Sequence, residues 1–208
     1  MKRFVIAGIG TEIGKTFISA ILTQALEADY WKPVQAGSLD CTDTDFVKLH
    51  ISNHKTVFHP EGYRLQAAMS PHAAAAAEGL SIDLEKLEIP VTGNHLVIEL
   101  AGGLMVPLND RELNTDLLKH WGLPVILVSQ NYLGSINHTL LSLEVLKQQG
   151  IEVPGIIFNG DCNPATEEFI LRYSGVPCLA RIERHEQITK ATVKELADGL
   201  KSRLKQYT

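Results

Sequence analysis

The stretch KRFVIAGIGTEIGKT, residues 2–16, decides the fold class of this chain. The apolar run at residues 4–7 predicts a buried strand, and the apolar periodicity further on predicts a helix over residues 14–28. A loop that contains two glycines connects them and runs into a Gly-Lys-Thr triplet. Strand, glycine loop, Gly-Lys-Thr and helix in this order are typical of a phosphate-binding P-loop.

The residue types of this loop suit the binding of an anion. Gly8 and Gly10 allow backbone N–H groups to turn inward without an obstructing side chain. The helix start after Gly14 adds unpaired N–H groups and the positive end of the helix dipole. Lys15 supplies a positive charge for the β- and γ-phosphates of a nucleotide, and the hydroxyl of Thr16 suits Mg²⁺.

The spacing of the loop departs from the usual pattern, because Ile9 stands where the first glycine is expected. An ordinary glycine turn before a helix is therefore the alternative interpretation. The position directly after the first strand, with Lys-Thr following, favours a nucleotide site.

Composition limits the function classes. The length of 208 residues suits one domain, which we expect to span residues 1–208. The net charge of −5 gives no overall basic footprint for nucleic acid. The three cysteines form no CxxC pair, so neither a zinc site nor a disulfide framework is indicated. No stretch approaches the length of a membrane span. We therefore expect a cytoplasmic protein that binds neither nucleic acid nor a membrane.

Apolar strands alternate with helices along the chain. Strands are expected at residues 4–7, 30–34, 95–100, 125–129, 153–158 and 178–182. Helices are expected at residues 14–28, 73–78, 113–120, 136–149, 164–173 and 192–205, and residues 35–93 are read mostly as loops and short helices. The alternation predicts an α/β, P-loop NTPase-like fold, with a mostly parallel central sheet and helices on both faces.

Polar residues fall where the carboxyl ends of these strands are expected, which is where ligands gather in such sheets. Lys32 ends the second strand, Glu99 lies near the end of the third, and Asn159 follows the fifth. Lys32 alone would also suit a surface lysine with a buried stem.

Two acids are candidates for Mg²⁺. A carboxylate in a strand as apolar as that of Glu99 is costly unless it is paired or bound to a metal. A structural ion pair is the alternative for Glu99. In the segment DCTDTDF we expect one carboxylate, among Asp40, Asp43 and Asp45, to reach Mg²⁺. Calcium is not favoured, because the loop lacks the glycine and glutamate spacing of an EF-hand.

Six motifs occur along the chain in a fixed order. They are TEIGKT (11–16), KPVQAGS (32–38), SPH (70–72), ELAGGLMVPL (99–108), LGSINH (133–138) and FNGDCNP (158–164). Together they resemble the dethiobiotin synthetase family of biotin biosynthesis. The resemblance runs in register from residue 2 to residue 164 and is weak beyond it.

The resemblance implies an enzyme that uses ATP and Mg²⁺ to close a ring. Its substrates would be 7,8-diaminopelargonic acid and CO₂. One amine becomes a carbamate that attacks the γ-phosphate of ATP, and the neighbouring amine captures the resulting anhydride. The products would be dethiobiotin, ADP and phosphate. The resemblance also implies a cytosolic homodimer with the substrate at the dimer interface.

Roles for individual residues follow from the same resemblance. The implied catalytic residues are Thr11, Glu12, Lys15 and Lys32, and the implied metal ligands are Thr16, Asp45 and Glu99. The implied nucleotide-binding residues are Gly10, Glu12, Ile13, Gly14, Lys15, Thr16, Phe17 and Asn159. The implied substrate-binding residues are Lys32, Ala36, Gly134 and Asn137. The implied contacts of Gly134 and Asn137 are with the substrate carboxylate, from the second subunit. Asn159 would read the edge of adenine, since an amide both donates and accepts.

The chain departs from the family pattern at three places. Ile9 and Gly10 replace a usual Thr-Asp, and Ala36 stands where a hydroxyl is common. Arg181 and Glu183 replace a glycine and a proline near the ribose and base. None of these removes an expected phosphate or metal ligand.

Two other classes share parts of the pattern. Another P-loop ligase or a small-molecule kinase also places a lysine and acids at strand ends. A ParA/MinD-like partitioning ATPase carries a signature lysine early in the P-loop, and positions 10 and 11 hold no lysine here. Both classes are alternatives to the dethiobiotin synthetase interpretation.

Overall fold

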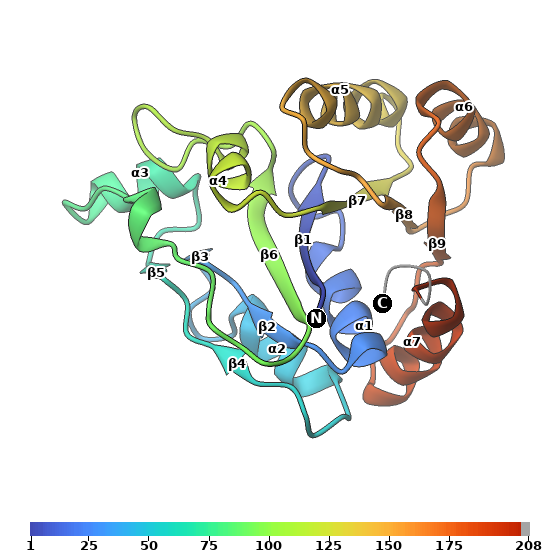
Figure 1. Ribbon diagram of the computed structural model, residues 1–208, viewed down its shortest axis with the longest axis horizontal. Coiled ribbons are helices and arrows are strands. Elements are labelled where there is room, and N and C mark those ends of the chain that lie inside the picture. The colour runs from blue at the N-terminus through green and yellow to red at the C-terminus, as the bar shows by residue number, and fades with distance from the viewer. Residues whose placement is uncertain (205–208) are drawn as a thin grey trace.

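A central sheet of seven strands forms the middle of the molecule (Figure 1). The structure is a computed structural model and describes residues 1–204. The strands stand in the order β4-β2-β6-β1-β7-β8-β9, and each neighbouring pair is parallel. Their bounds are β1 (Arg3–Gly8), β2 (Asp29–Trp31), β4 (Phe58–His59), β6 (Leu96–Gly103), β7 (Val125–Gln130), β8 (Gly155–Asn159) and β9 (Cys178–Ile182). The expected parallel sheet is confirmed.

Helices cover both faces of the sheet, as predicted. The first face is covered by α1 (Lys15–Leu26), α2 (Asp43–His50) and α7 (Lys190–Leu204). The second is covered by α4 (Asn114–Trp121), α5 (Ser135–Gln148) and α6 (Pro164–Ser174). Helix α3 (Pro71–Ala77) continues the same apolar layer beside the central sheet, where it packs on β3 (Val34–Ala36) and β5 (Tyr63–Leu65). Among residues 1–204, no helix has both the length and the apolarity needed to cross a membrane.

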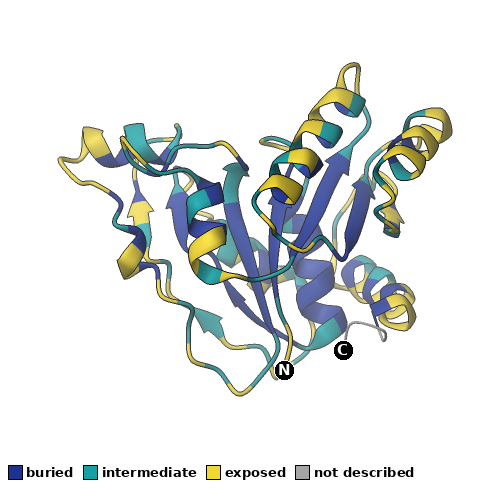
Figure 2. Ribbon diagram, turned by 45° about the horizontal axis from the view of Figure 1, so that its top comes forward, coloured by how far each residue is buried: buried dark blue, intermediate teal, exposed yellow. Residues whose placement is uncertain are grey.

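Strand β1 contributes apolar side chains to the core on both faces of the central sheet. Phe4 and Ile6 pack beneath α1, whereas Val5 and Ala7 pack against the helices of the opposite face. Side chains alternate along a strand, so a strand that is buried on both sides is apolar throughout. In Figure 2 the central strands are mostly buried, and most exposed residues lie on the outer surfaces of the helices and on loops.

One expected strand is wrong as a single element. Residues 30–34 divide into β2 of the central sheet and β3 (Val34–Ala36), which pairs with β5 (Tyr63–Leu65) in a separate two-stranded sheet. Pro33 lies between them, and proline has no N–H with which to continue a ladder.

Five elements lie wholly within residues 35–93, the segment that was expected to be mostly loops and short helices. Helices α2 and α3 and the short 3₁₀ turn η1 (Leu84–Lys86) fit that expectation, whereas strands β4 and β5 do not. Both strands have three residues or fewer, which is too short for an alternating pattern to be read. The expected end of the last helix, Lys205, lies outside the described residues.

The turn from β1 into α1 requires a glycine. Gly14 has a φ of 85°, in the region that residues with a side chain rarely adopt. A Cβ at this position would lie 2.2 Å from Asn159 Nδ2, which comes from the end of β8. The P-loop is therefore seated directly against the carboxyl end of a second strand.

Candidate functional site

A cavity of about 790 Å³ opens beside the P-loop, at the carboxyl ends of β1, β3 and β6. Of the predicted site residues, those that line it are Thr11, Glu12, Gly14, Lys15, Thr16, Lys32, Ala36 and Glu99. The position agrees with the rule that ligands bind outside the carboxyl ends of parallel strands.

Lys15 is buried at the base of the P-loop. Its side chain turns back so that Nζ donates to the carbonyl oxygen of Gly10 at 2.7 Å. Burial, and then the charge of Lys32, lower the pKa of Lys15 to about 8. The negative charge near the ammonium of Lys15 is therefore too small to offset its burial, and an anionic phosphate would supply more.

Thr16 joins two acids at the first turn of α1. Its Oγ1 lies 2.9 Å from Glu99 Oε1 and 2.9 Å from Asp43 Oδ1. One hydroxyl and two carboxylates therefore meet at a single point beside the cavity. Hard oxygen donors of this kind are the ligands that Mg²⁺ prefers.

Lys32 lies in the same cluster and is almost fully buried. Its Nζ is 3.0 Å from Glu99 Oε1 and 2.6 Å from Asp43 Oδ2. Burial lowers the pKa of Lys32, but the two carboxylates outweigh burial and raise it above its ordinary value. For Asp43, burial raises the pKa, and Lys32 more than offsets it, so the net pKa is lowered. Lys32 and Asp43 therefore both stay charged at neutral pH.

The structure does not bring the predicted Asp45 to Thr16 and Lys32, and the acid that lies beside them is Asp43. Asp45 is the third residue of α2, where its Oδ2 accepts from the backbone N of Thr42 at 3.0 Å and from Thr42 Oγ1 at 2.8 Å. Thr42 in turn caps the backbone N of Asp45. This reciprocal capping box turns Asp45 away from Lys32 and Thr16.

A sequence signal for this assignment exists. Thr42 and Asp45 have the threonine-x-x-acid spacing of a capping box, which identifies the third residue as a cap and leaves Asp43 for the site. Among residues 1–204, no group of three or more His, Cys, Asp and Glu side chains is arranged to hold a metal. A cation here would therefore have two carboxylates and the Thr16 hydroxyl as protein ligands.

Tyr30 is a second residue that sequence reasoning missed. Its hydroxyl donates to Glu99 Oε2 at 2.9 Å, and it is completely buried. Burial first, and then the charge of Glu99, raise the pKa of Tyr30 well above its ordinary value. The phenol therefore remains a donor to the carboxylate.

Ala36 lines the cavity without offering a hydroxyl, as its sequence departure indicates. Ser38 and Ser70 line the same cavity. Hydroxyl groups are thus available in the cavity from these neighbouring positions.

Glu12 has a φ of 58°, so the chain bends sharply where Thr11 and Glu12 line the cavity.

Ile13 and Phe17 have buried side chains within the core, so their contacts with a nucleotide would come from the backbone. Asn159 lies outside the cavity, and its Nδ2 donates to the carbonyl oxygen of Ile13 at 2.9 Å. The carbonyl oxygen of Gly10 accepts from Lys15 Nζ. Asn159 is thus placed against the P-loop, at the end of β8.

Arg181, one of the departures from the family pattern, is held at the end of β9. Its Nε donates to Glu167, a buried acid that also accepts from Asn131 Nδ2 at 2.8 Å. The guanidinium lies 6.0 Å from the ring centroid of Phe158. These contacts tie the ends of β7, β8 and β9 together beside Asn159.

Gly134 and Asn137 do not line the cavity. Gly134 precedes the first turn of α5 with a φ of 102°, and both residues are exposed. The cavity within one chain is therefore formed without them.

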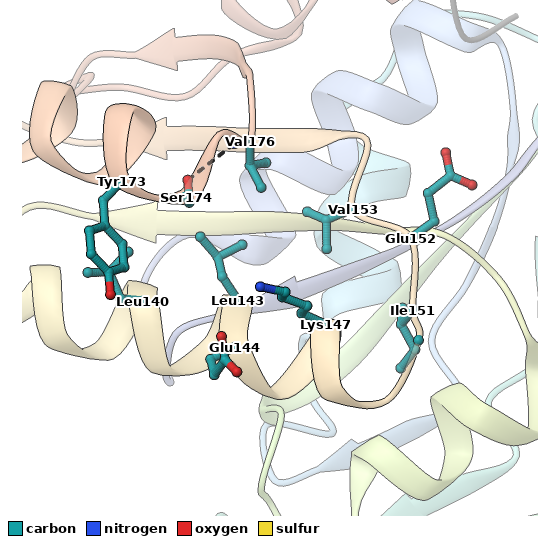
Figure 3. A pocket seen from close by; sticks show the side chains of 11 residues that line it. Leu140, Leu143, Glu144, Lys147, Ile151, Glu152, Val153, Tyr173, Ser174 and Val176 are labelled. Atoms are coloured by element: carbon teal, nitrogen blue, oxygen red, sulfur yellow. Dashed lines mark hydrogen bonds between the residues drawn. The ribbon is translucent and has the colours of Figure 1, made fainter.

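A second cavity, of about 420 Å³, lies between α5, α6 and the loop that leads into β8 (Figure 3). Its walls include Leu140, Leu143 and Val153, and no predicted site residue lines it. Because this loop enters β8 at its amino end, the second cavity lies away from the edge at which parallel sheets bind ligands.

Comparisons with known proteins agree with this geometry. The family described as an AAA domain matches residues 2–192. ATP-dependent dethiobiotin synthetase BioD of Christiangramia forsetii is 50% identical over 203 residues, with 98% of each chain covered. The protein of the same name from Cytophaga hutchinsonii is 50% identical over 194 residues, covering 93% of this chain and 94% of that one.

The chain belongs to the dethiobiotin synthetase family. The family resemblance in the six motifs is therefore confirmed, and the similarity extends beyond residue 164.

Solved structures of lower identity share the fold. The MinC:MinD cell division protein complex of Aquifex aeolicus matches with a TM-score of 0.64 and 13% identity, covering 100% of this chain and 97% of that one. A ParA family ATPase from Chlorobium tepidum matches with a TM-score of 0.58 and 16% identity, covering 99% and 92%. The P-loop NTPase-like fold is thus confirmed.

Proposed function

We propose that this protein is an ATP-dependent dethiobiotin synthetase. It closes 7,8-diaminopelargonic acid and CO₂ into the cyclic urea of dethiobiotin, with ATP converted to ADP and phosphate. The observation that carries this proposal is the cluster of Lys15, Lys32, Thr16 and Glu99 around one cavity. Two relatives named dethiobiotin synthetase are 50% identical to this chain and are matched over 98% and 94% of their own length, which supports the proposal.

The reacting groups are anionic, so the protein has to bring negative charges together. Carbamate and triphosphate repel one another, and charge develops on the transferred oxygens. Two lysines that lie at the P-loop and at the end of β2 lower this repulsion by electrostatics and positioning. In this proposal Lys15 binds the phosphates, and Lys32 lies between the carbamate and the γ-phosphate.

The ring closure proceeds in three balanced steps. One amine adds to CO₂ and loses a proton, which gives the carbamate. A carbamate oxygen attacks the γ-phosphorus, and the bond to the bridging oxygen of ADP breaks. The second amine then attacks the carbamoyl carbon, loses its proton, and displaces phosphate. Thr11 and Glu12 line the cavity where these amines would lie and are the candidates for orienting them.

Mg²⁺ is the expected cation of the nucleotide, with Thr16, Asp43 and Glu99 as its protein ligands. The donor set fits, because a hydroxyl and two carboxylates converge on one point. When bound, the cation would neutralise charge on the phosphate oxygens. Mg²⁺ commonly takes one or two carboxylates and completes its shell with water and phosphate.

Further parts of the proposal concern the base, the assembly and the location. We propose that Asn159 contacts the adenine edge and that one domain spans residues 1–208.

Gly134 and Asn137 would bind the substrate carboxylate from the second subunit of a homodimer. Their exposure at the start of α5 supports this, because helix N–H groups there suit an anion. The absence of a membrane-spanning helix among residues 1–204 agrees with a cytoplasmic location.

The test is an ATP-hydrolysis assay with diaminopelargonic acid and bicarbonate, with mass detection of the cyclic urea. We expect substrate-dependent release of ADP together with dethiobiotin, and none from Lys15→Ala. Hydrolysis without the cyclic urea would contradict the proposal. The partitioning-ATPase alternative rests on likeness of fold alone, and binding to DNA or vesicles in a pull-down would favour it.

A further inference from the structure

Tyr30 reaches Glu99 across the sheet from the neighbouring strand. In the pairing of β2 with β6, Tyr30 stands opposite Val97. Val97 and Glu99 point to the same face, because side chains alternate along a strand. The tyrosine therefore reaches diagonally along this face, and its hydroxyl donates to Glu99 Oε2 at 2.9 Å.

The two oxygens of Glu99 have different surroundings. Oε1 accepts from Thr16 Oγ1 at 2.9 Å and from Lys32 Nζ at 3.0 Å, and both of these residues line the cavity. Oε2 accepts from Tyr30, which packs in the apolar layer beneath α1. The carboxylate is thus held with one oxygen toward the core and the other toward the cavity.

Both partners are firmly enclosed. The exposed fraction is 0% for Tyr30 and 1% for Glu99. The ring of Tyr30 also packs against Phe58, with the two centroids 6.1 Å apart. The hydroxyl therefore has a fixed position from which to orient the carboxylate.

We propose that Tyr30 is a positioning residue that presents Glu99 Oε1 to the divalent cation of the bound nucleotide. This inference rests on the proposed function, because it uses the metal site at Thr16, Asp43 and Glu99. Without the phenol, the carboxylate turns about its terminal bond, and both oxygens compete for Thr16 and Lys32. A hydrogen bond to a metal-binding carboxylate commonly changes metal affinity by about ten- to a hundredfold.

The test measures Mn²⁺ binding by electron paramagnetic resonance, in the presence of a non-hydrolysable ATP analogue, so that no turnover is needed. The variants are Tyr30→Phe, Glu99→Gln and the double substitution. The matched control is Tyr63→Phe, which removes a phenol that accepts from the backbone N of Asp83 at 2.9 Å and does not line the cavity. Melting curves without metal are recorded for every variant.

We expect Tyr30→Phe to bind Mn²⁺ roughly tenfold more weakly than the unmodified protein, and Tyr63→Phe to bind it equally well. In the Glu99→Gln background, Tyr30→Phe should have no further effect, because the phenol acts through that carboxylate. These results together support the positioning role.

Three outcomes would overturn it. Unchanged Mn²⁺ affinity in Tyr30→Phe, with or without a lower melting temperature, would limit the phenol to stability. An equal loss of affinity in the Glu99→Gln background would mean that Tyr30 acts by another route. Unchanged affinity in Glu99→Gln itself would remove the metal site of the proposed function and this inference with it.

Discussion

Substitutions of Asp43 and of Asp45 form a matched pair that distinguishes an effect on the active site from an effect on helix stability. Both residues lie in the first turn of α2, so Asn at either position removes the same favourable charge from a helix N-terminus. That loss costs about 0.3–1 kcal/mol of stability. For a chain of this size the loss of the helix charge alone lowers the melting temperature by a few degrees at most, and Asp43→Asn loses the ion pair with Lys32 in addition.

The two substitutions should differ greatly in catalysis. Asp43 Oδ2 is 2.6 Å from Lys32 Nζ, and Oδ1 is 2.9 Å from Thr16 Oγ1. Asp43→Asn therefore removes one of two carboxylates from the metal set and leaves Lys32 with Glu99 alone. We expect kcat/KM to fall about a hundredfold, equivalent to about 2.7 kcal/mol of transition-state stabilisation. Asp45→Asn retains an oxygen for Thr42 and should keep kcat/KM within about twofold of the unmodified enzyme.

The assay measures dethiobiotin formation by mass over a range of Mg²⁺ concentrations, with melting temperatures recorded in parallel. The Asp43→Asn enzyme should need much more Mg²⁺ for half-maximal rate, whereas Asp45→Asn should follow the unmodified curve. The opposite ranking would refute the placement of the acids. An equal, small effect of both would refute a metal role for Asp43.

Three further predictions concern the same cavity. Glu99→Gln should shift the Mg²⁺ titration to higher concentration by at least tenfold, because a ligating carboxylate becomes an amide; an unchanged titration would leave Glu99 a purely structural partner of Lys32. Asn159→Ala should lower the preference for ATP over GTP in competition assays, and an unaltered ratio would speak against a contact with the base. Burial, and then Lys32, lower the pKa of Lys15 to about 8, so calorimetric affinity for ADP should weaken as the pH rises above 8 and the amine loses its charge. A flat profile between pH 7 and 9.5 would contradict that role.

The fold and the site could be predicted from the sequence wherever a residue type at its position has few physical explanations. Glu99, an acid within an apolar strand, and Lys15, which directly follows the loop glycine, were both expected at a charged site, and the parallel sheet places both in one cavity. The helices and strands with long apolar patterns were also predicted within a few residues.

The sequence was insufficient where the partner is remote or the local pattern is short. The segment around Asp43 and Asp45 offers three acids, and only the helical capping distinguishes them. The link between Tyr30 and Glu99 depends on the pairing of two strands that are distant in sequence, so no local motif encodes it. The contribution that we propose for Gly134 and Asn137 would come from a second chain, so the fold of one chain does not reveal it.

The close approach of Gly14 and Asn159 has a consequence for how this enzyme can change. The two residues are 145 positions apart in the chain, yet the amide nitrogen of Asn159 fills the space in which any side chain at position 14 would begin. Even alanine at position 14 would have to displace the side-chain amide of Asn159, and its backbone would be strained at a φ of 85°. A library that varies the two sites separately should return few active clones at position 14, and a smaller residue at position 159 would relieve the contact with Asn159 but not the strain of a side chain at a φ of 85°.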